Sequence, residues 1–288
     1  MMSSLAKWIM SGPFQALAAA VALAMVPGLG WTSGAVIALV ALRKSISDAA
    51  VPFLGAAAVA VMVHWPAGDV SQLGLVLAAV VAAVVLAGTR SLAWAVIAAA
   101  VVSALYMLSI QSLAAAKVDH LVTLFQPSFD AFEAELKKTG NEAMLELVTV
   151  RSVVVEGMAW VTTLGAIASL LLARWLQARL YNPGGFRAEF HQLRLTPMAA
   201  AGLMLVLILV QAKPEARMVL PCAVMPLLLA GLGLVHGLFG RKPNSLPLLV
   251  FFYVGLLVSA GLGVMLLISA AVMDSFVDFR KRIQKRYE

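Results

Sequence analysis

Glu156 is the one carboxylate of this sequence that lies clearly inside an apolar run. An ionisable side chain in such a run is costly to keep from water, and membrane proteins that hold one usually place it on a solute or proton pathway. Glu156 stands only a few residues inside its run, so an ion pair with Arg151 or Lys117 explains it equally well. The sequence offers Glu156 either as a solute-binding residue or as half of an ion pair.

Pro221 and Pro226 stand together in a later apolar run. A proline inside a helix removes the amide donor of one carbonyl a turn earlier. Discontinuous helices with freed carbonyls line solute sites in transporters, whereas kinked helices satisfied by their neighbours are more common. Solute binding and a structural kink are both open for this pair.

No residue pattern here is typical of catalysis or of metal binding. HExxH, P-loop and GxSxG motifs are absent. The four histidines have no cysteine or carboxylate partner at ligand spacing, and the single cysteine, Cys222, lies in an apolar run. We therefore expect a protein that is not an enzyme and that holds no metal and no cofactor.

The densest group of specific polar residues is the segment 180–195, LYNPGGFRAEFHQLRL, between two apolar runs. Phe186, Phe190 and Leu193 recur at steps of four and three beside basic residues, which predicts a short helix half sunk in a membrane surface. We predict a cytoplasmic interfacial loop over 174–196 that docks a partner or lipid headgroups. Its candidate docking residues are Asn182, Pro183, Gly184, Gly185 and Arg187.

A second candidate docking element is the basic tail, residues 279–288, which we expect in the cytoplasm. Asp274, Asp278 and Arg282 stand four apart and would share one face of a helix leaving the membrane. On that face Asp278 and Arg282 would form an ordinary ion pair. A partner or anionic lipid is the alternative occupant, with Asp274, Asp278, Arg280 and Arg282 as the contacting residues.

The composition of the chain is typical of a membrane protein. Of 288 residues, 62% are hydrophobic and 12% are charged, against about 25% charged in soluble domains. Apolar runs long enough to cross a core of about 30 Å recur. They are apolar on every face, which excludes an outer-membrane barrel. The net charge of +7 does not indicate nucleic acid, because the basic residues lie in loops and the tail.

The predicted fold is an all-α polytopic membrane protein of eight to ten spans, several of them short or broken by proline and glycine. Pro27–Trp31 divides the first run into a hairpin of two short helices or one broken helix. We favour the hairpin, because it places Lys7 and Arg43 together in the cytoplasm and Trp31 at the outer interface. A break at Ser259–Gly263 would likewise place both termini in the cytoplasm.

The interval 111–150 is the longest polar one and carries six of the fourteen acidic residues. Five apolar residues within it recur at helical spacing: Leu121, Phe125, Phe129, Phe132 and Leu136. We predict an extracytoplasmic amphipathic helix, started or kinked at Pro127. It lies on the outer leaflet or covers a pocket as a lid. The whole chain, 1–288, is predicted to be a single membrane domain.

Small residues predict where helices approach closely. Ala16, Ala20 and Ala24 share one face of the first run, and Gly233 and Gly237 share a face of the run that contains the two prolines. We assign both groups to helix packing.

The motifs Tyr181–Phe186 (YNPGGF) and Asp274–Arg282 (DSFVDFRKR) resemble the bacterial YybS-like membrane proteins, a widespread family of predicted multi-span proteins without an assigned function. The resemblance covers most of the chain in layout and is specific at those two motifs. More distantly, the short first helix, the Pro/Gly break and Ala41–Lys44 (ALRK) are similar to S components of energy-coupling-factor vitamin transporters.

S components bind a small solute and dock on an ATP-driven module, which they contact through small residues four apart, the spacing of the three alanines. This chain departs from them in its number of apparent spans and its long insert. The resemblance implies a bacterial cytoplasmic-membrane protein that binds a small solute or serves its transport, with a protein partner. The alternative is a membrane scaffold acting through its cytoplasmic loop and tail; an intramembrane enzyme has little support.

Overall fold

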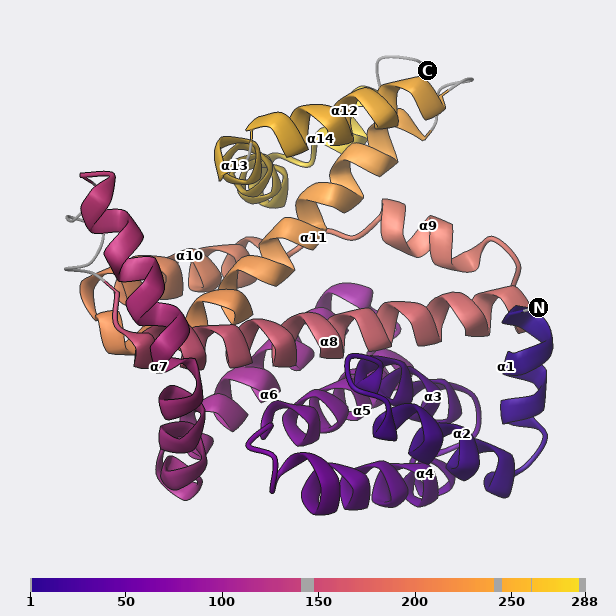
Figure 1. The fold of residues 1–288 in the computed structure, drawn as a ribbon. Helices are drawn as coiled ribbons and strands as arrows, with labels where there is room; N and C mark the ends of the chain where they lie inside the picture. Colours follow the sequence, from indigo (N-terminus) through magenta and orange to yellow (C-terminus); the bar gives the residue numbers. More distant parts are fainter. Residues whose placement is uncertain (1, 141–147, 241–244, 260, 285–288) are drawn as a thin grey trace.

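The computed structural model is built around one long helix, α8 (Val150–Tyr181), which runs through the middle of the molecule (Figure 1). The structure describes residues 2–140, 148–240, 245–259 and 261–284. Within these ranges every regular element is a helix, so the predicted all-α polytopic fold is confirmed. The described helices long and apolar enough to cross a membrane number five: Ile46–His64, Ser71–Thr89, Leu92–Leu113, Val150–Tyr181 and Ala216–Phe239.

Four shorter apolar helices and one bent pair accompany these five. The bent pair is α1 (Met2–Met10) and α2 (Pro13–Met25), which meet at 120°. The shorter helices are α3 (Gly30–Arg43), α10 (Pro197–Ala212), α12 (Ser245–Ser259) and α13 (Gly261–Val277). A total of eight to ten spans requires several of them to cross, and that number stays a prediction.

Helix α8 begins at a reciprocal cap. Ser152 N donates to Thr149 Oγ1 over 3.1 Å, and Thr149 N donates to Ser152 Oγ over 3.0 Å, which satisfies two amides that a helix start leaves free. The helix ends only at Tyr181, and Asn182 caps it before Pro183. The predicted cytoplasmic loop therefore begins as the last two turns of α8.

The N-terminal half packs on one side of α8, where α2, α3 and α4 lie together in Figure 1. Helix α3 is buried along nearly its whole length among α2, α5 and α8. The α2–α3 hairpin is closed by a 2.7 Å hydrogen bond from Ser33 Oγ to the Ala20 carbonyl oxygen. The other helices here are α4 (Ile46–Val59), continued by the π-helix η1 (Ala60–His64), α5 (Ser71–Thr89) and α6 (Leu92–Leu113).

The tip of the α2–α3 hairpin lies beside the middle of α8, well away from its first turn. Ser169 Oγ donates to the Trp31 carbonyl oxygen, and Gln177 Nε2 donates to the Leu42 carbonyl oxygen over 2.9 Å. Helix α3 thus follows only the last part of α8, because its 14 residues extend about 21 Å. Trp31 shares a cavity with His64 and Asp69, which lie at the end of the apolar helix Ile46–His64 and in the loop before Ser71–Thr89. Its placement at the outer interface stays a prediction.

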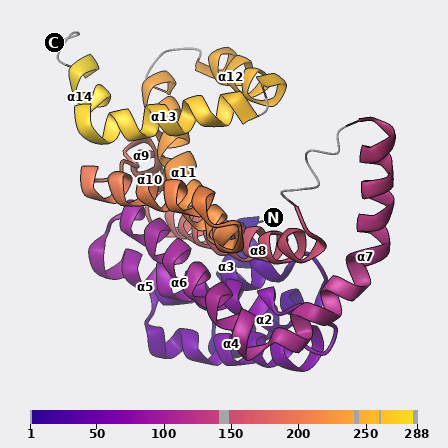
Figure 2. The same ribbon diagram turned by 90° about the vertical axis from the view of Figure 1, so that its left-hand side faces the viewer.

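Helix α7 (Ala115–Lys138) follows α6 after one residue and runs through Pro127 as a single helix. Pro127 therefore does not start the helix, and of the two predicted roles only a kink remains. It crosses the Val150 end of α8, away from the hairpin (Figure 1), and stands at the edge of the molecule in Figure 2. A 440 Å³ apolar cavity separates the two helices, and Phe125, Phe129 and Phe132 line it. Residues 141–147 of the insert lie outside the described ranges.

The C-terminal half packs around α11 (Leu220–Phe239), which follows the 3-10 helix η3 (Pro214–Val219) and contacts α8 and α13. Pro221 stands in the first turn of α11, where a missing amide costs nothing, and the helix continues through Pro226. Of the two alternatives left open for these prolines, the structure therefore does not show the discontinuous helix. The division of 248–279 is confirmed, because α12 ends at Ser259 and α13 begins at Gly261.

Helix α14 (Phe279–Gln284) is a separate element from α13. Asp278 between them has a φ of 52°, in the left-handed region that ends a helix. Asp274, Asp278 and Arg282 therefore do not share one helix face, and the Asp278 carboxylate pairs with Arg194 and Lys281. The side chain of Arg282 and residues 285–288 lie outside what the structure describes.

Candidate functional site

The first candidate site is a cavity of about 490 Å³ at the tip of the α2–α3 hairpin, called here the tip cavity. Its floor is the Pro27–Trp31 turn, and the middle of α8 forms one wall through Leu164 and Gly165. The polar residues that line it are His64, Asp69 and Gln72.

Gln72 is the polar group of the tip cavity whose bonding is incomplete. Gln72 is 6% exposed, and among the described residues nothing accepts a hydrogen bond from its Nε2. The side-chain amide rests on Gly30, where a Cβ would collide with it. Because a buried donor without an acceptor is costly, its presence beside a cavity indicates an acceptor supplied by water or a ligand.

The other two polar side chains hold the cavity wall in place. His64 Nε2 donates to the Ala24 carbonyl oxygen over 2.7 Å, and its Nδ1 lies 3.7 Å from Asp69 Oδ2. Asp69 Oδ1 accepts from the Ser71 amide over 3.0 Å at the start of α5. The N-termini of α3 and α5 both reach the cavity through Gly30 and Gln72. Their dipoles make it more positive than its side chains alone would.

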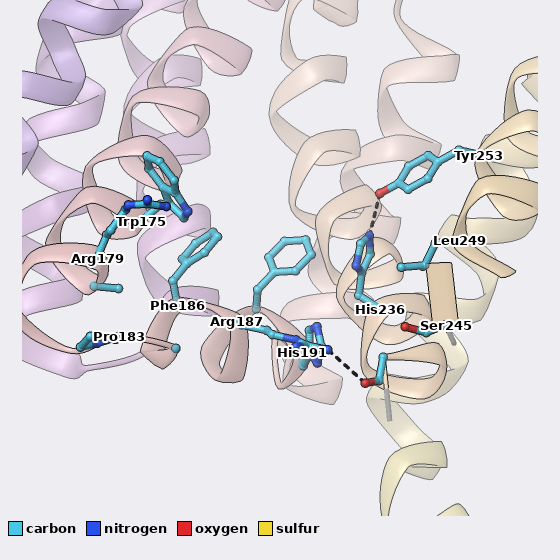
Figure 3. A pocket seen from close by; sticks show the side chains of 14 residues that line it. Trp175, Arg179, Pro183, Phe186, Arg187, His191, His236, Ser245, Leu249 and Tyr253 are labelled. Carbon is cyan, nitrogen blue, oxygen red and sulfur yellow. Dashed lines mark hydrogen bonds between the residues drawn. The ribbon is translucent and has the colours of Figure 1, made fainter. Parts of the chain in front are cut away.

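The second candidate site, called here the α9 cavity, has a volume of about 900 Å³. It lies between the end of α8 on one side and α11 with α12 on the other, with α9 (Gly185–His191) between them (Figure 3). Its polar and aromatic lining residues are Trp175, Arg179, Phe186, Arg187, Phe190, His191, His236, Ser245 and Tyr253. His236 Nε2 and Tyr253 Oη share a 2.7 Å hydrogen bond that joins α11 to α12.

Two sets of contacts hold α9 against its neighbours. Arg174 of α8 binds the Glu189 carboxylate through two nitrogens, with Nε donating to Oε2 over 2.8 Å. On the opposite side, Gly233 and Gly237 of α11 face backbone. A Cβ on Gly233 would lie 2.7 Å from the Phe190 oxygen, and one on Gly237 would lie 2.6 Å from the His191 oxygen. These two glycines therefore allow the close approach of α9.

The residues predicted to dock a partner divide between two places. Pro183, Gly184 and Arg187 line the α9 cavity. Asn182 and Gly185 close the turn before α9 through a 3.0 Å backbone hydrogen bond. Asp274, Asp278 and Arg280 instead belong to an ion-pair group at the α13–α14 joint, together with Arg194.

The residues predicted to bind solute lie outside both cavities. Glu156 is half-buried near the start of α8, and among the described residues its carboxylate has no hydrogen-bond or ion-pair partner. Arg151 pairs with Asp119 of α7 instead of Glu156. Pro221 and Pro226 are buried within α11. Neither Glu156 nor the prolines line the tip cavity or the α9 cavity.

The structure adds site residues that the sequence did not single out, chiefly Gln72, Trp175, His236 and Tyr253. Gln72 stands at the start of an apolar run, where a polar residue is ordinary. Only its contact with Gly30, 42 positions away, distinguishes it. Within the described ranges, no three His, Cys, Asp or Glu residues gather as a metal site.

Comparison with known proteins adds no relative. No protein-family model, no curated protein and no solved structure matches this chain. The resemblance to YybS-like proteins and to S components therefore stays a prediction.

Proposed function

We propose that this chain is a membrane protein of the S-component type that binds a small solute in the tip cavity. The observation that carries the proposal is the buried Gln72 amide, whose Nε2 has no acceptor within the described structure. A bound solute with a carbonyl or carboxylate oxygen would satisfy this donor. The volume of about 490 Å³ lies in the range of about 300 to 1,000 Å³ that is usual for small-molecule sites.

The helices around the cavity support the same function. Helices α2 and α3 are each about 20 Å long, shorter than a core of about 30 Å, and the cavity at their turn also meets the ends of the longer apolar helices Ile46–His64 and Ser71–Thr89. Half-length helices whose N-termini point at a central cavity are typical of transporter sites. Trp31, Leu75 and Leu164 form apolar walls, so the expected solute combines an acceptor oxygen with an apolar part.

The proposed location is the bacterial cytoplasmic membrane, with the Tyr181 end of α8 facing the cytoplasm. Arg43 lies over the Tyr181 ring at 4.2 Å, and Arg174 and Arg179 occupy the same end of α8. The acidic α7 crosses the opposite end. This distribution of charge supports the proposed orientation by the positive-inside rule.

An ATP-driven module of the kind that S components dock on could not contact the three alanines of α2. Ala16, Ala20 and Ala24 are all buried within this chain, where Ala20 and Ala24 receive hydrogen bonds from Ser33 and His64. Their role in this fold is contact between helices.

The test is native mass spectrometry of the protein purified from its own membranes. We expect a small molecule to remain bound to the natural protein and to be lost from Gln72→Leu, which removes the amide donor. Gln192→Leu is the control, since Gln192 is exposed and lines neither cavity. An empty natural protein, or equal retention by Gln72→Leu, would overturn the proposal.

A further inference from the structure

We propose that the α9 cavity is a second ligand site, which binds a phosphate group carried on an apolar stem. This site is independent of the tip cavity, since the two share no lining residue. The chemistry fits two sources, the headgroup of an anionic lipid and a soluble phosphate ester.

The α9 cavity carries positive charge that no carboxylate of its own lining balances. Arg179 and Arg187 line it, and no Asp or Glu does. The nearest acid on α9, Glu189, is already bound through two hydrogen bonds to Arg174. Among the described residues, no carboxylate forms an ion pair with Arg179 or Arg187. An anion is therefore the ligand that the lining favours.

The two guanidinium groups retain most of their hydrogen-bonding capacity. Arg187 uses Nη2 for a 3.1 Å hydrogen bond to the Gly240 carbonyl oxygen, which directs its side chain across the cavity toward α11 (Figure 3). Arg179 is held over the Trp175 ring, 5.4 Å from the centroid. Each guanidinium has five N–H donors. The two guanidinium groups come from different helices, α8 and α9. An anion that binds both of them therefore needs several oxygens, as a phosphate has.

The remaining walls are aromatic and suit an apolar stem. Phe186 and Phe190 stack with ring centroids 6.0 Å apart, and Phe190 meets the His236 ring at 5.6 Å. Trp175 lies at the end of α8, at the level where aromatic residues favour the membrane surface. Basic groups beside aromatic walls make this an amphiphilic site, unlike the largely apolar cavity between α7 and α8.

The experiment measures binding of two phosphate probes to the purified protein. Phosphatidic acid is added to detergent micelles and counted by native mass spectrometry, and phenyl phosphate is titrated by calorimetry. We expect at least one probe to bind the natural protein and to bind about tenfold more weakly to Arg179→Gln and to Arg187→Gln, since each variant removes a charge-assisted contact. Both arginines are exposed, so thermal unfolding should change little, even though Arg187→Gln also loses the exposed hydrogen bond to the Gly240 carbonyl oxygen.

Lys44→Gln is the matched control, because Lys44 is an exposed cation near the same end of α8 but outside the cavity. Binding of phosphatidic acid alone identifies a lipid source, and binding of phenyl phosphate identifies a soluble ester; either result supports the site. Absence of binding by both probes, or equal weakening by Lys44→Gln, would overturn it. Gln72→Leu should leave phosphate binding intact, which separates this test from that of the tip cavity.

Discussion

Arg194, in the link between α9 and α10, donates from Nη1 to Oδ2 of Asp278 over 3.2 Å. The same guanidinium donates to the carbonyl oxygens of Asp274 and Ser275 over 2.8 and 2.9 Å, and so occupies acceptors at the end of α13. Asp278 Oδ1 in turn accepts from the Lys281 amide at the start of α14. The charge pair therefore fixes the joint between α13 and α14 against the loop that follows α9.

The joint should weaken in acid. Burial alone raises the pKa of Asp278, but the Lys281 amide and the positive charges of Arg194 and Lys281 outweigh it and hold that pKa below its ordinary value. A depressed carboxyl pKa stabilises the fold above the unfolded value of about 3.9, and that stabilisation is lost as the pH falls through the folded pKa.

Asp278→Asn tests this prediction, because asparagine tolerates the same left-handed backbone and removes only the charge. In thermal unfolding of the detergent-solubilised protein, we expect the variant to be less stable near neutral pH and to approach the natural protein in acid. A stability difference that stays constant with pH would contradict the role of the charge.

Alanine at Gly233 or Gly237 should loosen α9. The added Cβ would press on the backbone oxygens of Phe190 or His191, and overpacking of this kind costs about 1 to 3 kcal/mol. Gly202→Ala is the control, since its Cβ would meet nothing within 4 Å. Alanine in an exposed helix should be neutral or stabilising. Equal unfolding temperatures for all three variants would show that α9 does not need the close approach.

The ion pair between Arg174 and Glu189 should respond unequally to loss of either partner. The Arg174 side chain is 9% exposed, whereas that of Glu189 is 34% exposed. Glu189→Gln leaves a buried guanidinium without its carboxylate and should cost about 3 kcal/mol or more. Arg174→Gln leaves a carboxylate that reaches solvent and should cost less. A double-mutant cycle measures the coupling, and the reverse order of cost would contradict the proposed burial.

Glu156→Gln should leave stability nearly unchanged, within about 0.5 kcal/mol. The reason is that no described residue forms a hydrogen bond or ion pair with the Glu156 carboxylate. Arg151→Gln is the comparison, since Arg151 pairs with Asp119. A clear loss of stability in Glu156→Gln would instead reveal a partner for this carboxylate.

Reporter fusions after Gly140 and after Glu288 test the proposed orientation. We expect activity of a periplasmic phosphatase after Gly140 and fluorescence of a cytoplasmic reporter after Glu288, because the acidic insert and the basic tail fall on opposite sides. A cytoplasmic Gly140 or an external Glu288 would contradict the proposed orientation or change the number of spans.

The all-helical membrane fold, the α2–α3 hairpin and the break between α12 and α13 could all be predicted from the sequence. Each depends on local properties: the length of an apolar run, the turn-forming residues Pro27 and Gly28, and the small residues after Ser259. Hydropathy and turn preference act within a few neighbouring residues, so the order of residues alone determines them.

The candidate sites depended on contacts between distant residues, which only the tertiary structure decided. Trp31 lies beside Ser169, 138 positions away, because α3 packs against α8. Gln72 becomes notable only next to Gly30. Arg194 and Asp278 stand 84 positions apart. Packing brings such residues together, and no spacing within one segment records it.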